Sequence, residues 1–376
     1  MVWMRTRLPT ICSRSITAKL IMNSSSKSEQ EIGLEPLVSQ QPLVSVSVSF
    51  PKFTRRVLIL GVGPLARDLC QTLLSKRTGF TEVVGFLDKD ASRVGERLVN
   101  PSIIGTYDQL FEIAERYQVH TVAVCLEDRR AVLPVQTLLD MKAMGRDVVD
   151  GHYLYEEESG RLSIDHLKPS ALIFSTGFRR RLVTMLLKRA LDVLVAIIGM
   201  IALLPLVVVL SIIIKVDSSG PVFYRQMRVG LRGRPYMIWK FRSMRQDAEQ
   251  SGARWASSED PRVSRVGRWI RKWRLDELPQ LINVMKGEMS LVGPRPERPV
   301  FVQELRNTIP YYDLRHTVRP GITGWAQTRF RYGASKEDSH VKLQYDLFYV
   351  KNLSLALDLR IVVHTIKVML MGEGAR

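Results

Sequence analysis

RKWRLDELPQLINVMKGEMSLVGPRP, residues 271–296, sets two adjacent carboxylates, Asp276 and Glu277, at the start of a predicted helix. Apolar residues recur at spacings of three and four, which forms one apolar helical face and leaves Pro279 in the first turn. We expect Asp276 near the N-cap, where free backbone N–H groups keep a carboxylate ionised and can also hold phosphate oxygens. Four cations flank the pair, namely Arg271, Lys272, Arg274 and Arg295. An ordinary solvated helix start has the same pattern. Other parts of the chain are therefore needed to distinguish a functional carboxylate pair from an ordinary helix start.

The composition predicts two compact domains with anionic partners. The chain has 376 residues, 45% of them hydrophobic, and a formal net charge of +18. Nucleic acid, anionic lipid and phosphorylated small molecules would all suit this charge. The three cysteines and six histidines show no paired or metal-ligand spacing, so we expect a reduced, cytosolic and zinc-free protein.

The sequence of the amino-terminal part predicts a leader, followed by a domain of the nucleotide-binding type. Residues 1–52 are rich in Ser, Gln and Val and hold no stretch long enough for a signal or a membrane span, so we expect a disordered leader. Residues 53–164 then read as a Rossmann-like domain. A β-branched run leads into Gly61-x-Gly63-x-x-Ala66 and a helical period, and the next strand ends at Asp88. Glycines let the backbone approach a phosphate, and the acidic residue can reach a ribose hydroxyl; a Rossmann-like fold without a ligand is the alternative.

Further alternation supports an open parallel sheet. We expect a strand at 121–126, a helix at 135–145 closed by Gly145, and another strand at 147–151. Residues 165–187 form a linker.

A long apolar run follows the linker. Residues 193–214 carry no charge and would form a helix of roughly 33 Å, enough for a bilayer core of about 30 Å. Cations flank both ends, which the positive-inside rule places on the cytoplasmic face. Pro205 lies near the middle and frees a backbone carbonyl. We therefore predict a re-entrant hairpin over 191–215 that bends at Pro205; a buried core helix is the alternative.

Residues 216–244 predict a hairpin with aromatic and basic side chains. Tyr224, Tyr236 and Trp239 suit a membrane interface, and Arg225, Arg228, Lys240 and Arg242 suit phosphates or anionic lipid. A solvated basic face would look the same. The last part, residues 342–370, is helical in period with one apolar face, and we expect it to lie along a membrane.

Five motifs stand in order along the second half. They are KFRSM (240–244), LDELPQ (275–280), SLVGPRP (290–296), RPGITGWAQ (319–327) and YDLFYV (345–350). With them the chain resembles, from about Lys188 to its end, the bacterial sugar transferases, which are monotopic polyprenyl-phosphate phosphoglycosyl transferases. The amino-terminal half resembles the Rossmann-like domain of the larger exopolysaccharide members. After Gln327 this chain continues TRFRYG, where many relatives have Val-Asn-Gly-Arg.

The resemblance implies an activity and a location. A nucleotide diphosphate sugar, in particular a UDP-sugar, would give its sugar 1-phosphate to undecaprenyl phosphate and release the nucleoside monophosphate, which initiates exopolysaccharide or other surface glycan synthesis. The implied setting is the cytoplasmic face of the bacterial inner membrane, with membrane lipid and no nucleic acid as partner; a homo-oligomer is left open.

The resemblance also implies residue roles. Asp276 maps to the nucleophile that forms a phosphosugar-enzyme intermediate, and Glu277 would place Mg²⁺ or Mn²⁺ together with Asp276. Magnesium needs only one or two carboxylates plus phosphate. We expect the phosphate-binding side chains to be Lys240, Arg242, Arg271 and Arg295, with Asp346 as a further contributor.

The fold expectation is therefore α/β, with a Rossmann-like open parallel sheet, a membrane-embedded re-entrant hairpin, and a mixed, mainly helical catalytic domain over residues 188–376. Two other functions are alternatives. Tyr332-x-x-x-Lys336 has the spacing of nucleotide-sugar epimerases and dehydratases, but it lies far beyond the glycine turn and across the apolar run. The other is a non-catalytic nucleotide-sensing scaffold.

Overall fold

The structure is a computed structural model that describes residues 54–76, 80–128, 133–165, 169–245, 248, 260–330 and 335–371. The chain divides into two units, residues 1–50 and residues 51–376. The leader predicted over residues 1–52 lies outside the described residues.

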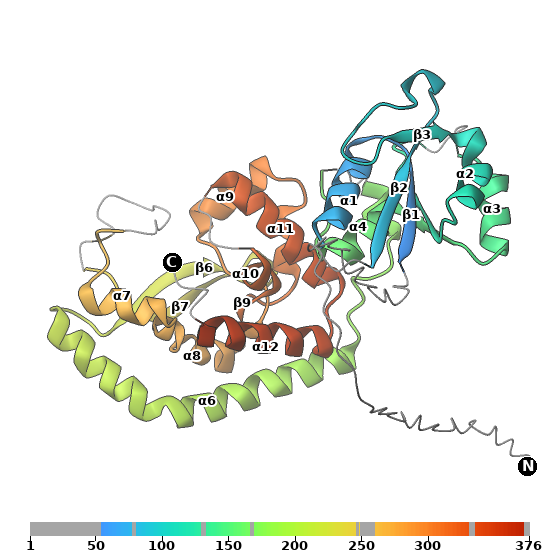
Figure 1. The fold of residues 1–376 in the computed structure, drawn as a ribbon. Coiled ribbons are helices and arrows are strands. Elements are labelled where there is room, and N and C mark those ends of the chain that lie inside the picture. Colours follow the sequence, from blue (N-terminus) through green and yellow to red (C-terminus); the bar gives the residue numbers. More distant parts are fainter. Residues whose placement is uncertain are drawn as a thin grey trace, which may run out of the picture. The chain divides into compact units, whose positions relative to one another are not determined.

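The amino-terminal domain is a five-stranded parallel sheet with helices on both faces (Figure 1). Its strands are β1 (Arg55–Leu60), β2 (Thr81–Asp88), β3 (Ile103–Thr106), β4 (Thr121–Val124) and β5 (Asp147–Asp150), in the order β3-β2-β1-β4-β5. Its helices are α1 (Pro64–Ser75), α2 (Leu110–Arg116), α3 (Val135–Ala143) and α4 (Gly151–Ser159), with short 3-10 turns η1 (Ala91–Arg93) and η2 (Tyr107–Gln109). The predicted open parallel sheet is confirmed.

The core of this domain follows from the alternation of β1. Val57 and Ile59 pack into the cluster that α1 and α4 cover, whereas Leu58 and Leu60 pack into the cluster that α2 and α3 cover. Side chains of a strand alternate between faces, so a continuous apolar strand needs helices on both sides.

After α5 (Pro169–Phe174), one uninterrupted helix, α6 (Leu182–Asp217), holds the apolar run. It is long and apolar enough to cross a membrane, with a mean hydropathy of 3.2 over its most apolar window and only 11% of that window buried. Figure 1 shows α6 as a bowed helix along one side of the second domain. The helix continues through Pro205. The long apolar helix is thus confirmed, while the re-entrant hairpin stays a prediction.

Both ends of α6 are attached to the same domain. Near its start, Lys188 donates to the Asp358 carboxylate at 2.7 Å, and Asp192 accepts from the Ser290 hydroxyl at 2.7 Å. Near its end, Leu210 and Ile214 pack in one core cluster with Phe241 and Ile270.

The second domain is mixed and mainly helical, as predicted. Strands β6 (Phe223–Val229) and β7 (Pro235–Phe241) form the predicted antiparallel hairpin around η3 (Leu231–Gly233), and β8 (Ser290–Val292) pairs in parallel with β9 (Gly321–Thr323). The remaining elements are α7 (Arg265–Lys272), η4 (Leu275–Glu277), α8 (Gln280–Lys286), α9 (Pro299–Thr308), η5 (Tyr312–Thr317), α10 (Trp325–Arg329), α11 (Lys336–Lys351) and α12 (Leu355–Met371). The last two confirm the predicted helical carboxyl-terminal part.

The segment that leaves α4 packs into the second domain. Leu162 and Ile164 belong to the core cluster of α9 and α11. The backbone N–H of Leu162 donates to Gln344 O at 3.1 Å, and the Trp325 indole donates to Gly160 O at 2.7 Å. Residues 160–164 therefore help to complete the core of the second domain, although they directly follow the domain of the parallel sheet.

We predict that Leu162→Ala destabilises the second domain by about 2–5 kcal/mol, because the change leaves a cavity in its core. Unfolding in detergent can be followed by tryptophan fluorescence, since every tryptophan after Trp3 lies between residues 239 and 325. The matched control is Leu139→Ala on α3, where the leucine is 55% exposed, and we expect a change within about 0.5 kcal/mol. Equal effects of the two variants would contradict this packing.

Candidate active site

The two carboxylates lie in a short 3-10 turn between two helices. Helix α7 ends at Lys272, Arg274 adopts a left-handed backbone conformation with φ of 53°, and η4 then carries Asp276 and Glu277. Helix α8 begins only at Gln280, after Pro279. Asp276 thus lies near an N-cap as predicted, two residues after Arg274, but that N-cap belongs to η4 and not to α8. Both carboxylates are buried, with 9% and 7% of their surface exposed, so the turn is not a solvated helix start.

The Glu277 carboxylate is held by two cations from other parts of the chain. Arg295 Nη2 lies 2.8 Å and Lys240 Nζ 3.6 Å from Glu277 Oε1. Burial alone would raise the pKa of Glu277, but Arg295 and Lys240 lower it to about 2. Glu277 is therefore ionised across the physiological range.

Asp276 is in a different electrostatic state. Burial and the neighbouring Glu277 carboxylate raise its pKa, against the attraction of Lys240 and Arg271. The pair thus combines a permanently charged carboxylate with one that is more basic than an ordinary aspartate, an arrangement typical of functional sites.

The predicted cations Lys240, Arg271 and Arg295 all act on this pair. Lys240 comes from β7, and its burial lowers its pKa. Arg271 comes from the last turn of α7, and within the described residues its Nη1 is buried without a hydrogen-bond partner. A buried guanidinium N–H of this kind can bind an anionic ligand. Three of the four predicted phosphate-binding cations are thereby brought together.

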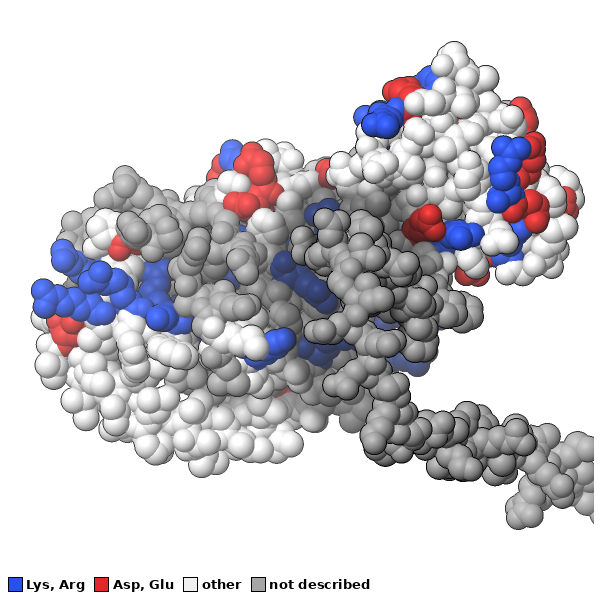
Figure 2. All heavy atoms as spheres, in the orientation of Figure 1, with Lys and Arg blue, Asp and Glu red and all other residues white. Residues whose placement is uncertain are grey.

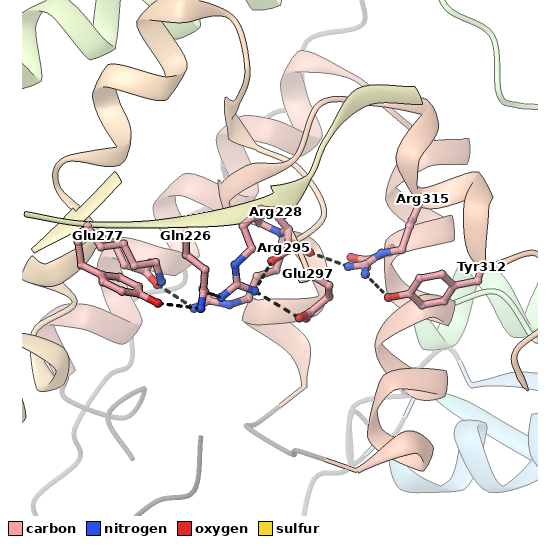
Figure 3. A network of polar contacts seen from close by, with 11 residues as sticks. Gln226, Arg228, Glu277, Arg295, Glu297, Tyr312 and Arg315 are labelled. Carbon is pink, nitrogen blue, oxygen red and sulfur yellow. Dashed lines mark hydrogen bonds and ion pairs between the residues drawn. The ribbon is translucent and has the colours of Figure 1, made fainter. Parts of the chain in front are cut away.

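Strand β6 carries a row of three polar side chains, of which Gln226 was not predicted from the sequence. Gln226 Nε2 donates to the Tyr224 hydroxyl at 3.1 Å, and Arg228 Nη2 donates to Gln226 Oε1 at 2.6 Å. Figure 3 shows Gln226 and Arg228 of this row near Glu277 and Arg295. Residues 224, 226 and 228 share one face because strand side chains alternate, and this period of two was the signal that could have indicated Gln226.

The hydrogen bonds of Arg242 and Asp346 go to residues other than the carboxylate pair. Arg242 donates to Ser218 O at 2.7 Å and to Ser219 O at 2.8 Å, which closes the end of α6. Asp346 is 2% exposed and accepts from Arg315 Nη2 at 2.8 Å. Burial raises the pKa of Asp346 to about 6, although Arg315 acts in the opposite direction. Both residues therefore have structural partners within the protein, and their role in phosphate binding stays a prediction.

The predicted amino-terminal nucleotide site has the expected glycine turn, but its acidic residue already has hydrogen-bond partners within the protein. Gly61 has a φ of +114°, and a Cβ there would lie 2.9 Å from Cys125 O, so a larger residue does not fit. Both oxygens of Asp88 already accept, from Lys89 N and from Arg93 Nη1, each at 2.7 Å. A Cβ on Gly63 would lie 2.9 Å from the Glu127 carboxylate, so this carboxylate lies close to the glycine turn. Its negative charge would repel a phosphate bound at the turn. Nucleotide binding by this domain stays a prediction.

The metal prediction can be compared with the carboxylates present. In the part of the chain that the structure describes, no three His, Cys, Asp or Glu side chains gather as metal ligands. Asp276 and Glu277 still fit Mg²⁺, because this ion keeps several waters and takes one or two carboxylates plus substrate phosphates. Of the epimerase-type pair, Tyr332 lies outside the described residues, and Lys336 binds Glu304 at 2.7 Å.

Comparison with known proteins places this site in a family. The family model described as bacterial sugar transferase matches residues 183–372, which include every residue of the carboxylate and cation cluster. The chain belongs to the bacterial sugar transferase family.

Three relatives illustrate the sugar transferase match. The UDP-N-acetylgalactosamine-undecaprenyl-phosphate N-acetylgalactosaminephosphotransferase of Aeromonas hydrophila is 47% identical over 59% of this chain and 52% of its own. The undecaprenyl-phosphate glucose phosphotransferase of Komagataeibacter xylinus is 34% identical over 86% of this chain and 60% of its own. The UDP-glucose:undecaprenyl-phosphate glucose-1-phosphate transferase of Escherichia coli is 34% identical over 70% and 57%. The chain thus spans little more than half the length of these relatives.

We predict that Arg295→Met lowers the free energy of unfolding by about 3 kcal/mol, because it leaves the buried Glu277 charge with one cation fewer. This is the lower end of the usual range, since 30% of the Arg295 side chain is exposed. The matched control is Arg306→Met, which removes the exposed pair with Asp313 and should cost at most about 1 kcal/mol. A second change, Glu277→Gln, should recover part of the loss in the Arg295→Met background. If Arg295→Met costs the same whether or not Glu277→Gln is present, the pairing is contradicted.

Proposed function

We propose that this protein transfers a sugar 1-phosphate from a nucleotide diphosphate sugar, in particular a UDP-sugar, to undecaprenyl phosphate. The nucleoside monophosphate leaves, and the lipid-linked sugar starts an exopolysaccharide or another surface glycan. The observation that carries the proposal is the buried Asp276–Glu277 pair, surrounded by Lys240, Arg271 and Arg295 within the family match. Two relatives are named as undecaprenyl-phosphate sugar phosphotransferases, one for N-acetylgalactosamine and one for glucose.

The raised pKa of Asp276 suits it to act as the nucleophile, because a more basic carboxylate is a stronger one. In the first step an Asp276 oxygen bonds to the sugar-proximal phosphorus, and the anhydride P–O bond breaks. The electron pair leaves with the nucleoside monophosphate, and an acyl phosphate remains on the enzyme. In the second step an oxygen of undecaprenyl phosphate attacks the same phosphorus and restores the carboxylate.

The cations make this attack feasible, since an anionic nucleophile must approach an anionic phosphate. Lys240, Arg271 and Arg295 would bind the phosphate oxygens and neutralise charge that develops on them. Glu277 keeps Lys240 and Arg295 in place through its own charge. Mg²⁺ or Mn²⁺ would be held by Asp276 and Glu277 and would further screen the phosphates.

The attachment of α6 supports the proposed re-entrant membrane helix. A straight helix of 36 residues is about 54 Å long, so a simple span would put its ends on opposite faces of the bilayer. Here Lys188 near the start and Ile214 near the end contact the same domain. One domain holds both ends most readily if α6 enters and leaves on the same face. We place that face in the cytoplasm of the bacterial inner membrane.

The surface near α6 supports this setting. Figure 2 shows an uncharged band along α6, with lysine and arginine side chains gathered next to it over α7. Many apolar side chains of α6 are exposed, including Ile201 at 70% and Leu204 at 59%. An exposed apolar helix beside basic residues suits a bilayer with anionic head groups.

We predict that Asp276→Asn abolishes both half-reactions, because it keeps the shape of the side chain and removes the attacking charge. Wild-type enzyme incubated with UDP-sugar and no acceptor should release UMP and retain a sugar phosphate on Asp276, detected by mass spectrometry. Kinetics with both substrates should be ping-pong. The control is Asp313→Asn, an exposed aspartate that should leave the rate unchanged. An Asp276→Asn enzyme with a near-normal rate would instead favour direct transfer.

We predict that both flanks of α6 are reached from the cytoplasmic side. Single cysteines at Arg181 and Arg234 can be labelled with an impermeant maleimide in vesicles of either orientation. Cys12 is replaced by serine, while the buried Cys70 and Cys125 stay. Both positions should react in inside-out vesicles and neither in right-side-out vesicles. Labelling from opposite sides would show a simple span.

A further inference from the structure

The turn of residues 294–297, which presents Arg295, is held at every backbone carbonyl. Each of its four carbonyls accepts a hydrogen bond from a different residue. Pro294 O accepts from Gly321 N at 3.0 Å, Arg295 O from Arg315 Nη2 at 2.8 Å, Pro296 O from Arg228 Nη1 at 3.1 Å, and Glu297 O from Val229 N at 3.0 Å. The prolines on both sides of Arg295 restrict φ further. The backbone of Arg295 is therefore fixed from two sides, while its side chain reaches Glu277.

Arg315 is the most firmly held of these donors. Its Nε and Nη2 donate to Asp346 Oδ2 at 3.1 and 2.8 Å, and its Nη1 donates to the Tyr312 hydroxyl at 2.7 Å. The side chains of Arg315 and Asp346 are 7% and 3% exposed. Figure 3 shows Arg315 between Tyr312 and the Arg295 turn, on the side of the turn away from Glu277.

A buried arginine–aspartate pair contributes little net stability by itself, because desolvation offsets most of the attraction. The pair does, however, fix the orientation of the arginine, and so it holds any further hydrogen-bond partner of that arginine in one geometry. The remaining partner of Arg315 here is the carbonyl of Arg295, so the pair connects α11 to the turn that carries a cation of the site.

We propose that Arg315 is a positioning residue for the transferase reaction. Fixed by Asp346 and Tyr312, it holds the Arg295 backbone so that the Arg295 guanidinium meets both Glu277 and the substrate phosphate. This proposal rests on the proposed function. Asp346 then acts through Arg315 and does not bind phosphate itself.

The test is a double-mutant cycle on the rate of UMP release, with the variants Arg315→Met, Arg295→Gln and their combination. A displacement of about 1 Å at a reacting group can cost about 100-fold in rate, so Arg315→Met alone should lower kcat by about 10- to 100-fold. In the Arg295→Gln background the same change should lower kcat by less than about 3-fold, because the group that Arg315 positions is already absent. Multiplicative losses would overturn the proposal, since Arg315 would then act on the fold in general.

Three comparisons make the result independent of folding and of the proposed function. Arg306→Met, which removes an exposed arginine–aspartate pair, should leave kcat unchanged. If Arg315→Met does not fold, Arg315→Lys replaces it in the cycle, because lysine keeps the charge beside Asp346 but lacks the fork that also reaches Arg295 O. Wild-type enzyme without UMP release would contradict the proposed function alone. In that case the shift in Tm caused by Arg315→Lys should shrink when Glu277 is replaced by glutamine, and an unchanged shift would overturn the positioning role.

Discussion

An ionised carboxylate buried inside a protein is stable only if cations and hydrogen bonds replace the water it has lost. Glu277 meets this requirement through Arg295 and Lys240, which come from separate segments of the chain. The turn η4, the strand β7 and the turn of residues 294–297 must therefore meet at one place. In the proposed function, the same cations that stabilise Glu277 also bind the substrate phosphate.

Strand β7, which carries Lys240, is held by hydrogen bonds of further residues. Asn283 of α8 accepts from Trp239 N at 2.9 Å and donates to Met237 O at 2.7 Å, which ties β7 to the helix that follows the site. Arg242, directly after β7, donates to Ser218 O and so connects the end of α6 to the strand that carries Lys240. A side chain held in this way keeps its geometry without further ordering when a ligand binds.

The two domains described here are joined by more than a linker. Gly160 accepts from Trp325, which lies in the RPGITGWAQ motif, and Leu162 enters the core of α9 and α11. Glu156 of α4 also pairs with Lys351 of α11. Packed and hydrogen-bonded residues therefore connect the two domains directly.

By itself the sequence determined the elements whose patterns are local. The parallel sheet follows from alternating strands and helices, the long helix from an uncharged apolar run, and the carboxylate and cation motifs from their order along the chain. The tertiary structure alone decided which charges meet. Arg242 donates to a carbonyl at the end of α6, and Asp346 accepts from Arg315. Gln226 accepts from Arg228 in the polar row on β6. No periodicity encodes such pairs, because they depend on which backbone segments approach one another and on the need of every buried charge for a partner.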